Sequence, residues 1–331
     1  MTHQHTDRIQ HTAQALLAPP RGILAVDESP GTMSQRLERV GVAPTATARR
    51  DYREMLLTTP ELARSISGAI FADETFGQEL SDGRSVSQAC SDAGVLAGIK
   101  VDTGAKPLAL TPGETVTEGL DGLRDRLTDY ASRGAAFAKW RAALALDDDL
   151  PTDRAVGVNA HALGRYAALC QEAGIVPIVE PELVMDGAHT IERCAEATAY
   201  VLDAVFAALH AQGVDLAGIV LKPNMVVAGT TCPRQPTVAE VAAATVQVLR
   251  GHVPEAVAGI AFLSGGQPPE VATAHLAAIA AESTPWQVTF SFGRALVDPA
   301  LRAWAGERAR WQAGQAALDG RVRANAGVLA A

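Results

Sequence analysis

The stretch "AGIVLKPNM", residues 217 to 225, is an apolar run that ends in a lysine. Continuous runs of this kind are typical of parallel strands that helices cover on both faces. Lysine is almost never fully buried unless it is paired or has a function. Lys222 is therefore either a functional group at a strand end or a side chain that reaches water along its long stem. The rest of the chain decides between these interpretations.

The same pattern, a short apolar run followed by polar residues and a turn, occurs eight times along the chain. Between the runs lie segments with helical spacing, several of which close on a glycine. Strand and helix alternating eight times predict a (β/α)8 barrel. The other seven runs are "GILAVDES" from Gly22, "GAIFADE" from Gly68, "LAGIKVD" from Leu96, "FAKWRAAL" from Phe137, "IVPIVEPE" from Ile175, "VAGIAFLSGG" from Val257 and "WQVTFSFGRAL" from Trp286. The clearest helical segments are "NAHALGRYAALCQEAG" from Asn159, "TIERCAEATAYVLDAVFAALHAQG" from Thr190 and "TVAEVAAATVQVLRG" from Thr237.

This α/β pattern predicts a single-domain TIM barrel over residues 1–331, with a helical N-terminal extension at 1–20 and a short C-terminal end at 321–331. The length would also allow two domains, and a doubly wound open sheet is the main rival fold. No G-x-G-x-x-G follows the first apolar run to favour dinucleotide binding. The glycine-rich segments "TPGETVTEGLDGL" from Thr111 and "PNMVVAGTTCPRQP" from Pro223 are predicted to be loops after strands three and six.

The composition is that of an ordinary globular protein, with 48% hydrophobic and 20% charged residues. A net charge of -9 argues against nucleic acid or an anionic membrane as a partner. The start of the chain lacks the features of a secretory signal, and no uncharged apolar run approaches the roughly 20 residues that span a bilayer. We therefore expect a cytoplasmic protein with free thiols. The cysteines, which form no C-x-x-C pair, are Cys90, Cys170, Cys194 and Cys232.

The active site of a (β/α)8 barrel lies at the carboxyl ends of its strands, and the predicted strands here end in polar or charged residues. These strand ends are therefore expected to meet in one mouth. The side chains expected there are Asp27, Lys100, Lys139, Arg141, Glu180, Glu182, Lys222, Ser264 and Arg294.

Two lysines in this mouth, Lys139 and Lys222, would repel each other and lose hydration, and both effects lower the pKa of an ammonium group. A lysine that is neutral near pH 7 attacks carbonyl carbons and forms a Schiff base, which is an electron sink for aldol chemistry without a metal. This route needs proton donors and acceptors, and Glu180 and Asp27 are placed for these tasks. Glu182 would point to the same face as Glu180. The alternative is that these carboxylates only pair with cations in a structural network.

A phosphate site is predicted beside this centre. "FLSGGQ", residues 262 to 267, offers backbone N–H groups at a Gly-Gly turn, and "SFGRAL" adds Arg294. Phosphate sites in these barrels frequently use the loops after strands seven and eight. Metal-dependent aldol chemistry would instead need histidines at strand ends. We expect no catalytic metal, because the histidines fall in the N-terminus, helices or loops, most of them at the surface. They are His3, His5, His11, His161, His189, His210, His252 and His275.

The chain resembles the class I fructose-bisphosphate aldolases, which work through a Schiff base. The resemblance extends from about Arg21 to Asn325, with the motifs in family order. The motifs are "GILAVDESPGTMSQRL", "GIKVDTG", "GETVTEGLDGL", "FAKWR", "GIVPIVEPE", "LKPNM", "GIAFLSGGQ" and "SFGRAL".

The resemblance implies a covalent Schiff base on Lys222 and no other cofactor. Glu180 would be the acid and base of imine formation, Asp27 would accept the substrate's hydroxyl proton, and Glu182 and Lys139 would support the charge network. The substrate would be fructose 1,6-bisphosphate and the products dihydroxyacetone phosphate and glyceraldehyde 3-phosphate, in glycolysis and gluconeogenesis. The family also implies a homotetramer. The residues implied for phosphate or substrate binding are Ser29, Arg36, Lys100, Arg141, Ser264, Gly265, Ser291 and Arg294.

The chain also departs from the family pattern. Gln35 stands where the family usually has lysine and Thr32 where it has serine, which bears on the distal phosphate, while Phe292 stands at a position where tyrosine is common. Family members usually carry a C-terminal tail ending in a tyrosine that assists proton exchange on the enamine, whereas no tyrosine follows Tyr200 here. Either another group would protonate the enamine, or cleavage would be slow relative to the earlier steps.

Two other functions stay open. A non-catalytic scaffold that senses sugar phosphates would be expected to lose part of the reacting set, but Asp27, Lys139, Glu180 and Lys222 are all present. The other is a Schiff-base lyase or transaldolase for a related ketose phosphate, such as sedoheptulose bisphosphate or fructose 1-phosphate. Gln35 keeps this second alternative open.

Overall fold

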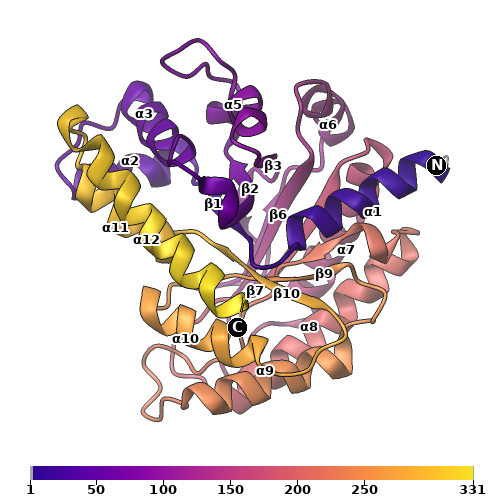
Figure 1. Ribbon diagram of the computed structural model, residues 1–331. Helices are drawn as coiled ribbons and strands as arrows, with labels where there is room; N and C mark the ends of the chain where they lie inside the picture. The colour runs from indigo at the N-terminus through magenta and orange to yellow at the C-terminus, as the bar shows by residue number, and fades with distance from the viewer. Residues whose placement is uncertain (1–2, 331) are drawn as a thin grey trace.

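Eight parallel strands close into a barrel in the computed structural model, which describes residues 3–330 (Figure 1). Each barrel strand overlaps one of the eight apolar runs, with β2 beginning two residues before its run and β7 ending one residue after. The predicted α/β TIM barrel is therefore confirmed and the open-sheet rival is wrong. Around the barrel the order is β1-β10-β9-β8-β7-β6-β3-β2. The barrel strands are β1 (Gly22–Val26), β2 (Ile66–Phe71), β3 (Leu96–Lys100), β6 (Phe137–Leu144), β7 (Val176–Leu183), β8 (Val220–Leu221), β9 (Gly259–Phe262) and β10 (Gln287–Phe292).

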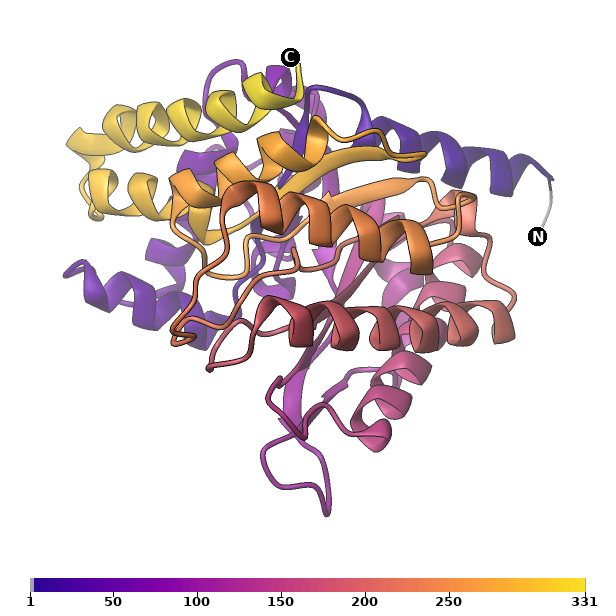
Figure 2. The ribbon, with the colours of Figure 1, turned by 90° about the horizontal axis from the view of Figure 1, so that it is seen from below.

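Helices cover the outside of the barrel, and α11 and α12 lie side by side in both views (Figures 1 and 2). The three clearest predicted helices each begin after a threonine, because its hydroxyl accepts a hydrogen bond from the backbone N–H three residues on; these are Thr152, Thr190 and Thr237. The helices are α1 (His3–Leu17), α2 (Pro30–Arg39), α3 (Ala46–Leu57), α4 (Asp73–Phe76), α5 (Val86–Asp92), α6 (Leu123–Ser132), α7 (Asp153–Glu172), α8 (Ile191–Ala211), α9 (Val238–His252), α10 (Pro269–Ala280), α11 (Arg294–Trp304) and α12 (Trp311–Leu329), with short 3-10 turns at Leu62–Arg64, Leu216–Gly218 and Arg308–Arg310.

Helix α1 closes the amino-terminal end of the barrel. Its side chains Ile9, Ala13, Leu16 and Leu17 are buried in an apolar cluster with inward-facing strand residues, among them Phe137. Apolar side chains that interdigitate in this way leave no channel through the barrel. The opposite end of the barrel, where the strands terminate, is where a cavity opens.

One predicted loop contains a strand. The segment "TPGETVTEGLDGL" includes β5 (Thr115–Glu118), which pairs antiparallel with β4 (Gly104–Pro107) to form a hairpin. The prediction weighed the glycines and missed the β-branched "TVT" between them, which favours extended backbone. Asn159 stabilises the hairpin because its side chain accepts a hydrogen bond from Thr117 N and donates one to Thr115 O. The other predicted loop, from Pro223, contains no helix or strand.

Two predicted helix boundaries need correction. Helix α9 does not close at Gly251 but continues to His252, and α7 begins at Asp153, before the predicted start at Asn159. Glycines do follow the ends of α7 and α8, where Gly174 and Gly213 have φ angles of 75° and 67°. The left-handed backbone at those two positions favours glycine over other residues.

Helix α8 is the one helix in residues 3–330 that is long and apolar enough to cross a membrane by length and composition. Its apolar face is buried in the protein, with Val201, Leu202, Val205 and Leu209 in the main core cluster. It also packs against α7 and α9. The apolar character of α8 is therefore that of a core helix.

Two glycines of α7 provide a matched test of packing. A Cβ on Gly164 would lie 2.8 Å from the backbone oxygen of Ala208 on α8, whereas a Cβ on Gly157 would meet nothing within 4 Å. We expect Gly164→Ala to lower the free energy of unfolding by about 1–3 kcal/mol through overpacking. Gly157→Ala is expected to raise it by about 1 kcal/mol, because alanine favours the helix. Thermal denaturation followed by circular dichroism measures both, and shifts of the same sign would contradict the close packing of α7 on α8.

Candidate active site

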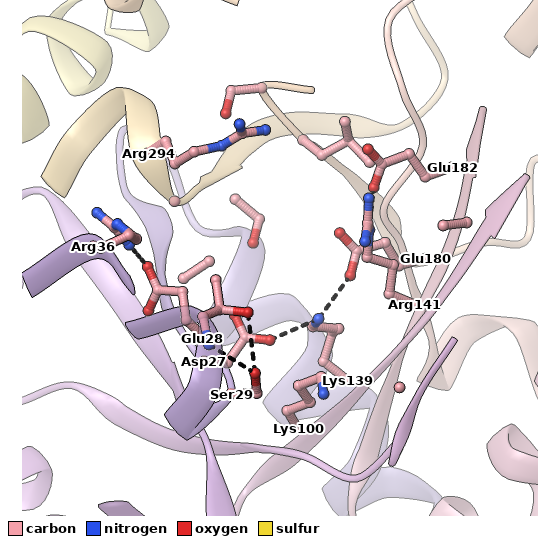
Figure 3. Close-up of a pocket in the computed structure, with 18 of the residues that line it drawn as sticks. Asp27, Glu28, Ser29, Arg36, Lys100, Lys139, Arg141, Glu180, Glu182 and Arg294 are labelled. Atoms are coloured by element: carbon pink, nitrogen blue, oxygen red, sulfur yellow. Dashed lines mark hydrogen bonds and ion pairs between the residues drawn. The ribbon is translucent and has the colours of Figure 1, made fainter. Parts of the chain in front are cut away.

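A cavity of about 770 Å³ opens at the carboxyl ends of the barrel strands. Figure 3 shows that its charged side chains come from opposite sides and point into the same space. Three of the chain's four lysines lie on its wall, although lysine is rare in this sequence. The residues of the predicted site that line the cavity are Asp27, Ser29, Arg36, Lys100, Lys139, Arg141, Glu180, Glu182, Lys222, Ser264, Gly265, Ser291 and Arg294.

The centre of the cavity is an alternating row of two carboxylates and two ammonium groups. Asp27 Oδ2 lies 2.6 Å from Lys139 Nζ, which lies 3.2 Å from Glu180 Oε2. Glu180 Oε1 lies 3.0 Å from Lys222 Nζ. Lys139 stands between Asp27 and Glu180 in Figure 3. Because the two positive and two negative charges compensate each other, all four can be withdrawn from water together.

These four side chains come from separate strands that only the closed barrel brings together. Lys139 lies in β6 and Glu180 in β7, two neighbouring parallel strands. Asp27 directly follows β1, and Lys222 directly follows β8. Lys139, Glu180 and Lys222 are each 3% exposed, so the snorkelling interpretation of Lys222 is wrong.

The two carboxylates of the row are held in their ionised form. Burial raises the pKa of Asp27, but the ammonium groups of Lys139 and Lys222 outweigh this effect and lower it to about 2. Burial likewise opposes ionisation of Glu180, and the same two lysines lower its pKa below the ordinary value. Both groups are therefore negatively charged at neutral pH.

The expectation that mutual repulsion lowers the lysine pKa is wrong for Lys139. Burial lowers the pKa of Lys139, but contacts with Asp27 and Glu180 raise it well above the ordinary value. An ammonium held between two carboxylates stays protonated and is a poor nucleophile. Lys222 contacts one carboxylate, Glu180, and is the better candidate nucleophile of the two.

Three further cations of the cavity each hold a carboxylate. Lys100 Nζ lies 2.9 Å from Asp102 Oδ1, and Arg141 donates to Glu182. Arg36, which is buried, pairs with Glu28 and with Asp298. An anionic ligand at these cations therefore competes with carboxylates that the protein already supplies.

Three of these carboxylates were not among the predicted site residues. Asp102 closes the motif "GIKVD" and Glu28 follows Asp27 in "VDES", so both carried a signal as charged residues at strand ends. Asp298 carried none, because it meets Arg36 only where the barrel brings α11 beside α2, the helices that follow the neighbouring strands β10 and β1. Asp102 has a second task, since it also accepts a hydrogen bond from Gly104 N at the start of the β4–β5 hairpin.

The turn after β9 is a candidate anion site. Gly265 and Gly266 have φ angles of 58° and 88°, and Gln267 N donates to Ser264 O at 3.0 Å. A Cβ on Gly266 would lie 3.0 Å from Arg294 Nη2, so the turn packs directly on this guanidinium. Within residues 3–330, no carboxylate pairs with Arg294. Successive backbone N–H groups beside such an arginine suit a phosphate.

The hydroxyl of Ser291 is a further unpartnered group of the cavity. Ser291 is 1% exposed, lies in β10 and lines the cavity. Its Oγ atom has no hydrogen-bond partner within residues 3–330. A buried hydroxyl without a partner costs free energy, and a ligand oxygen in the cavity would offset that cost.

Metal donors do not gather anywhere in the described part of the chain: no three His, Cys, Asp or Glu side chains stand together as a candidate metal site. None of the histidines from His5 onward lines the cavity. Two of them, His189 and His275, are buried, which the expectation of mostly surface histidines did not specify. The cysteines are all free and buried.

A barrel whose open end holds buried lysines, carboxylates and an anion-binding turn defines a (β/α)8-barrel enzyme for phosphorylated carbonyl compounds. The model of the family described as fructose-bisphosphate aldolase class-I matches residues 8–330. The chain belongs to the class I fructose-bisphosphate aldolases, a family of lyases, and the resemblance inferred from the motifs is confirmed.

Relatives from distant organisms agree with this assignment. A probable fructose-bisphosphate aldolase class 1 of Xanthomonas campestris is 51% identical over 90% of each chain. Fructose-bisphosphate aldolase C-B of Danio rerio is 46% identical over 98% of this chain and 92% of the relative. The solved Plasmodium falciparum aldolase, in complex with TRAP and a small molecule inhibitor, superposes with a TM-score of 0.97 at 41% identity, covering 99% of this chain and 96% of that one.

Proposed function

We propose that the chain cleaves fructose 1,6-bisphosphate reversibly to dihydroxyacetone phosphate and glyceraldehyde 3-phosphate through a Schiff base on Lys222. The observation that carries this proposal is the buried row Asp27, Lys139, Glu180 and Lys222. It supplies a nucleophile and two separate proton-transfer groups within one cavity. The names of the relatives support the choice of substrate.

Imine formation is the first step. Glu180, whose Oε1 lies 3.0 Å from Lys222 Nζ, takes one proton from the Lys222 ammonium, and the resulting amine adds to the ketone carbon C2. A second nitrogen proton passes to the carbonyl oxygen, which gives the carbinolamine. Glu180 then returns its proton to that hydroxyl group, which leaves as water. The product is a protonated imine, whose positive charge remains within reach of Glu180.

Carbon–carbon cleavage follows. Asp27 accepts the proton of the C4 hydroxyl, the C3–C4 bond breaks, and its electron pair moves into the imine to form an enamine. Glyceraldehyde 3-phosphate leaves with the new C4 carbonyl. The enamine then takes a proton at C3, and water releases dihydroxyacetone phosphate and returns Lys222. Lys139 stays positively charged between Asp27 and Glu180 and, with Glu182, supports the charges of the centre.

The two phosphates are assigned to opposite ends of the cavity. The turn at Ser264 and Gly265, with Arg294 and Ser291, holds the phosphate on C1. Its N–H groups, unpaired arginine and free hydroxyl support this assignment. The distal phosphate is assigned to the other side, whose residues are Ser29, Arg36, Lys100 and Arg141.

Fructose 1-phosphate is a second candidate substrate, because the distal cations are engaged. Gln35 carries no charge, and Arg36, Lys100 and Arg141 each contact a carboxylate. We expect kcat/KM for the bisphosphate to exceed that for the monophosphate by no more than about 10-fold, equivalent to about 1.4 kcal/mol. Steady-state kinetics with both sugars measures the ratio. An advantage of more than about 100-fold would mean that the cations release their carboxylates to the substrate.

The remaining assignments rest on the resemblance and on the charge. We propose a cytoplasmic homotetramer in which residues 1–331 form one domain, acting in glycolysis and gluconeogenesis. Its partners are then the sugar and triose phosphates, with neither nucleic acid nor membrane, in accord with the net charge of -9. The Schiff base replaces a metal as the electron sink, so no cofactor is needed.

Borohydride trapping tests the proposed function. Reduction in the presence of fructose 1,6-bisphosphate and excess chelator, followed by peptide mass analysis, is expected to attach substrate mass to Lys222. With few lysines in the chain, each is readily resolved as a separate peptide. Label on Lys139 or Lys100 would refute the assignment, and cleavage that stops with the chelator would refute the metal-independent route.

A further inference from the structure

A buried histidine outside the cavity contacts the turn assigned to the C1 phosphate. His275 lies in α10 and is 6% exposed, and its Nδ1 atom is 2.6 Å from Oε1 of Gln267. Gln267 ends the Ser264–Gln267 turn, since its backbone N–H donates to Ser264 O. His275 does not line the cavity and has no part in the reaction described above.

The side chain of Gln267 joins this turn to the segment that carries the nucleophile. Its Nε2 atom lies 3.6 Å from Sδ of Met225, three residues after Lys222. A backbone hydrogen bond from Leu263 N to Pro223 O, 3.2 Å long, connects the same two segments. The buried side-chain amide of Gln267 therefore connects the candidate anion site with the segment that carries Lys222.

The orientation of this amide depends on His275. A thioether sulfur accepts hydrogen bonds but cannot donate them, so the Gln267 –NH2 group faces Met225 and its oxygen faces the ring. Nδ1 of His275 must then carry the proton and donate it. Burial lowers the pKa of His275, which favours the neutral ring with one N–H. Without that donor, the buried amide oxygen of Gln267 loses its partner in the protein.

We propose that His275 is a positioning residue: by orienting Gln267 it fixes the distance between the C1-phosphate turn and Lys222. This proposal rests on the proposed function. The ketone carbon and its phosphate are separated by a fixed set of covalent bonds, so the turn and the lysine must match that separation. A misplacement of about 1 Å costs on the order of 10²-fold in rate. The requirement applies only to phosphorylated ketones.

Four variants test this role. His275→Leu removes the donor but keeps a side chain of similar bulk, while His275→Asn keeps an N–H near the position of Nδ1. Gln267→Leu removes the acceptor of the same hydrogen bond without changing a residue of α10. It takes the place of His275→Leu in the test if that variant fails to fold. Ile279→Ala is the matched control, because Ile279 is fully buried in the same helix, one helical turn further along it than His275.

The readout is borohydride trapping at Lys222 with two ketones, dihydroxyacetone phosphate and unphosphorylated dihydroxyacetone. We expect His275→Leu and Gln267→Leu to raise the half-saturating concentration of the phosphorylated ketone roughly 10-fold and to leave that of dihydroxyacetone unchanged. His275→Asn should restore the wild-type value. Equal rises for both ketones, or the same selective rise in Ile279→Ala, would overturn the proposal.

Calorimetric titration with inorganic phosphate separates this proposal from the proposed function. Phosphate needs the turn but not its distance from the nucleophile, so His275→Leu should bind it with the wild-type affinity even if Lys222 takes no label. Weaker phosphate binding in His275→Leu would mean that the histidine shapes the turn itself, and would overturn the distance-fixing role. An unlabelled Lys222 in the wild type would instead overturn the Schiff-base function.

Discussion

Lys222→Met is expected to abolish cleavage of fructose 1,6-bisphosphate and all covalent trapping by borohydride. The methionine has a similar length but no amine, so neither the carbinolamine nor the electron sink can form. Loss of a covalent nucleophile removes on the order of 10⁵-fold or more of the rate, as in other enzymes whose catalytic groups act as a unit. Turnover in a coupled triose phosphate assay and intact-protein mass after reduction are the two measurements.

The structure predicts that this variant still folds. Glu180 loses one ammonium partner but keeps Lys139 at 3.2 Å, so the buried carboxylate is not left alone. The matched control is Lys106→Met, which changes the exposed lysine of the β4–β5 hairpin and is expected to keep full activity. Covalent label that persists in Lys222→Met, on Lys139 for example, would show that the nucleophile has been assigned to the wrong lysine.

Asp27→Asn is expected to slow cleavage about 10³-fold while Schiff-base formation continues. An amide cannot accept the C4 hydroxyl proton, so the C3–C4 bond stays intact after the imine has formed. Reduction should then trap the whole hexose bisphosphate on Lys222, whereas the wild type should also yield the triose phosphate adduct. The mass of the adduct therefore identifies the blocked step.

This prediction depends on the charge state of Asp27. With a pKa of about 2, the carboxylate is ionised throughout the neutral range, so the substitution removes a negative charge as well as a proton acceptor. Lys139 then keeps Glu180 as its carboxylate partner. The exposed Asp121→Asn serves as a control with the same chemical change. A variant in which imine trapping falls as far as cleavage would assign Asp27 to the first step instead.

The eight strands were readable in the sequence because each one is a continuous apolar run bounded by polar residues. Helices such as α8 were readable from their helical spacing and terminal glycine. The β4–β5 hairpin carried only the weak signal of "TVT", since its four-residue strands are partly exposed and β5 is held by Asn159 of a distant helix. A strand that is held by such tertiary contacts shows little pattern in its own sequence.

The residues of the candidate site also fall into those that the sequence indicated and those that only the structure revealed. Lys139, Glu180 and Lys222 stood out because a charge beside a buried strand needs a reason. The pairing of Arg36 with Asp298 did not, because the two residues are separated by 262 positions and meet only when the barrel closes. The contacts from His275 through Gln267 to Met225 did not stand out in the sequence either, because they join α10, a turn and the segment after β8.

The sequence by itself determined the fold class, the family and which charged side chains lie at the barrel mouth, because apolar periodicity and charges at strand ends are local properties. The tertiary structure decided their ionisation. Two lysines in one barrel mouth would repel each other and favour the neutral amine, but Asp27 and Glu180 enclose Lys139 and keep it charged. Electrostatic interaction depends on distance in space, and only the closed barrel sets which opposite charges lie within 3.2 Å of each lysine.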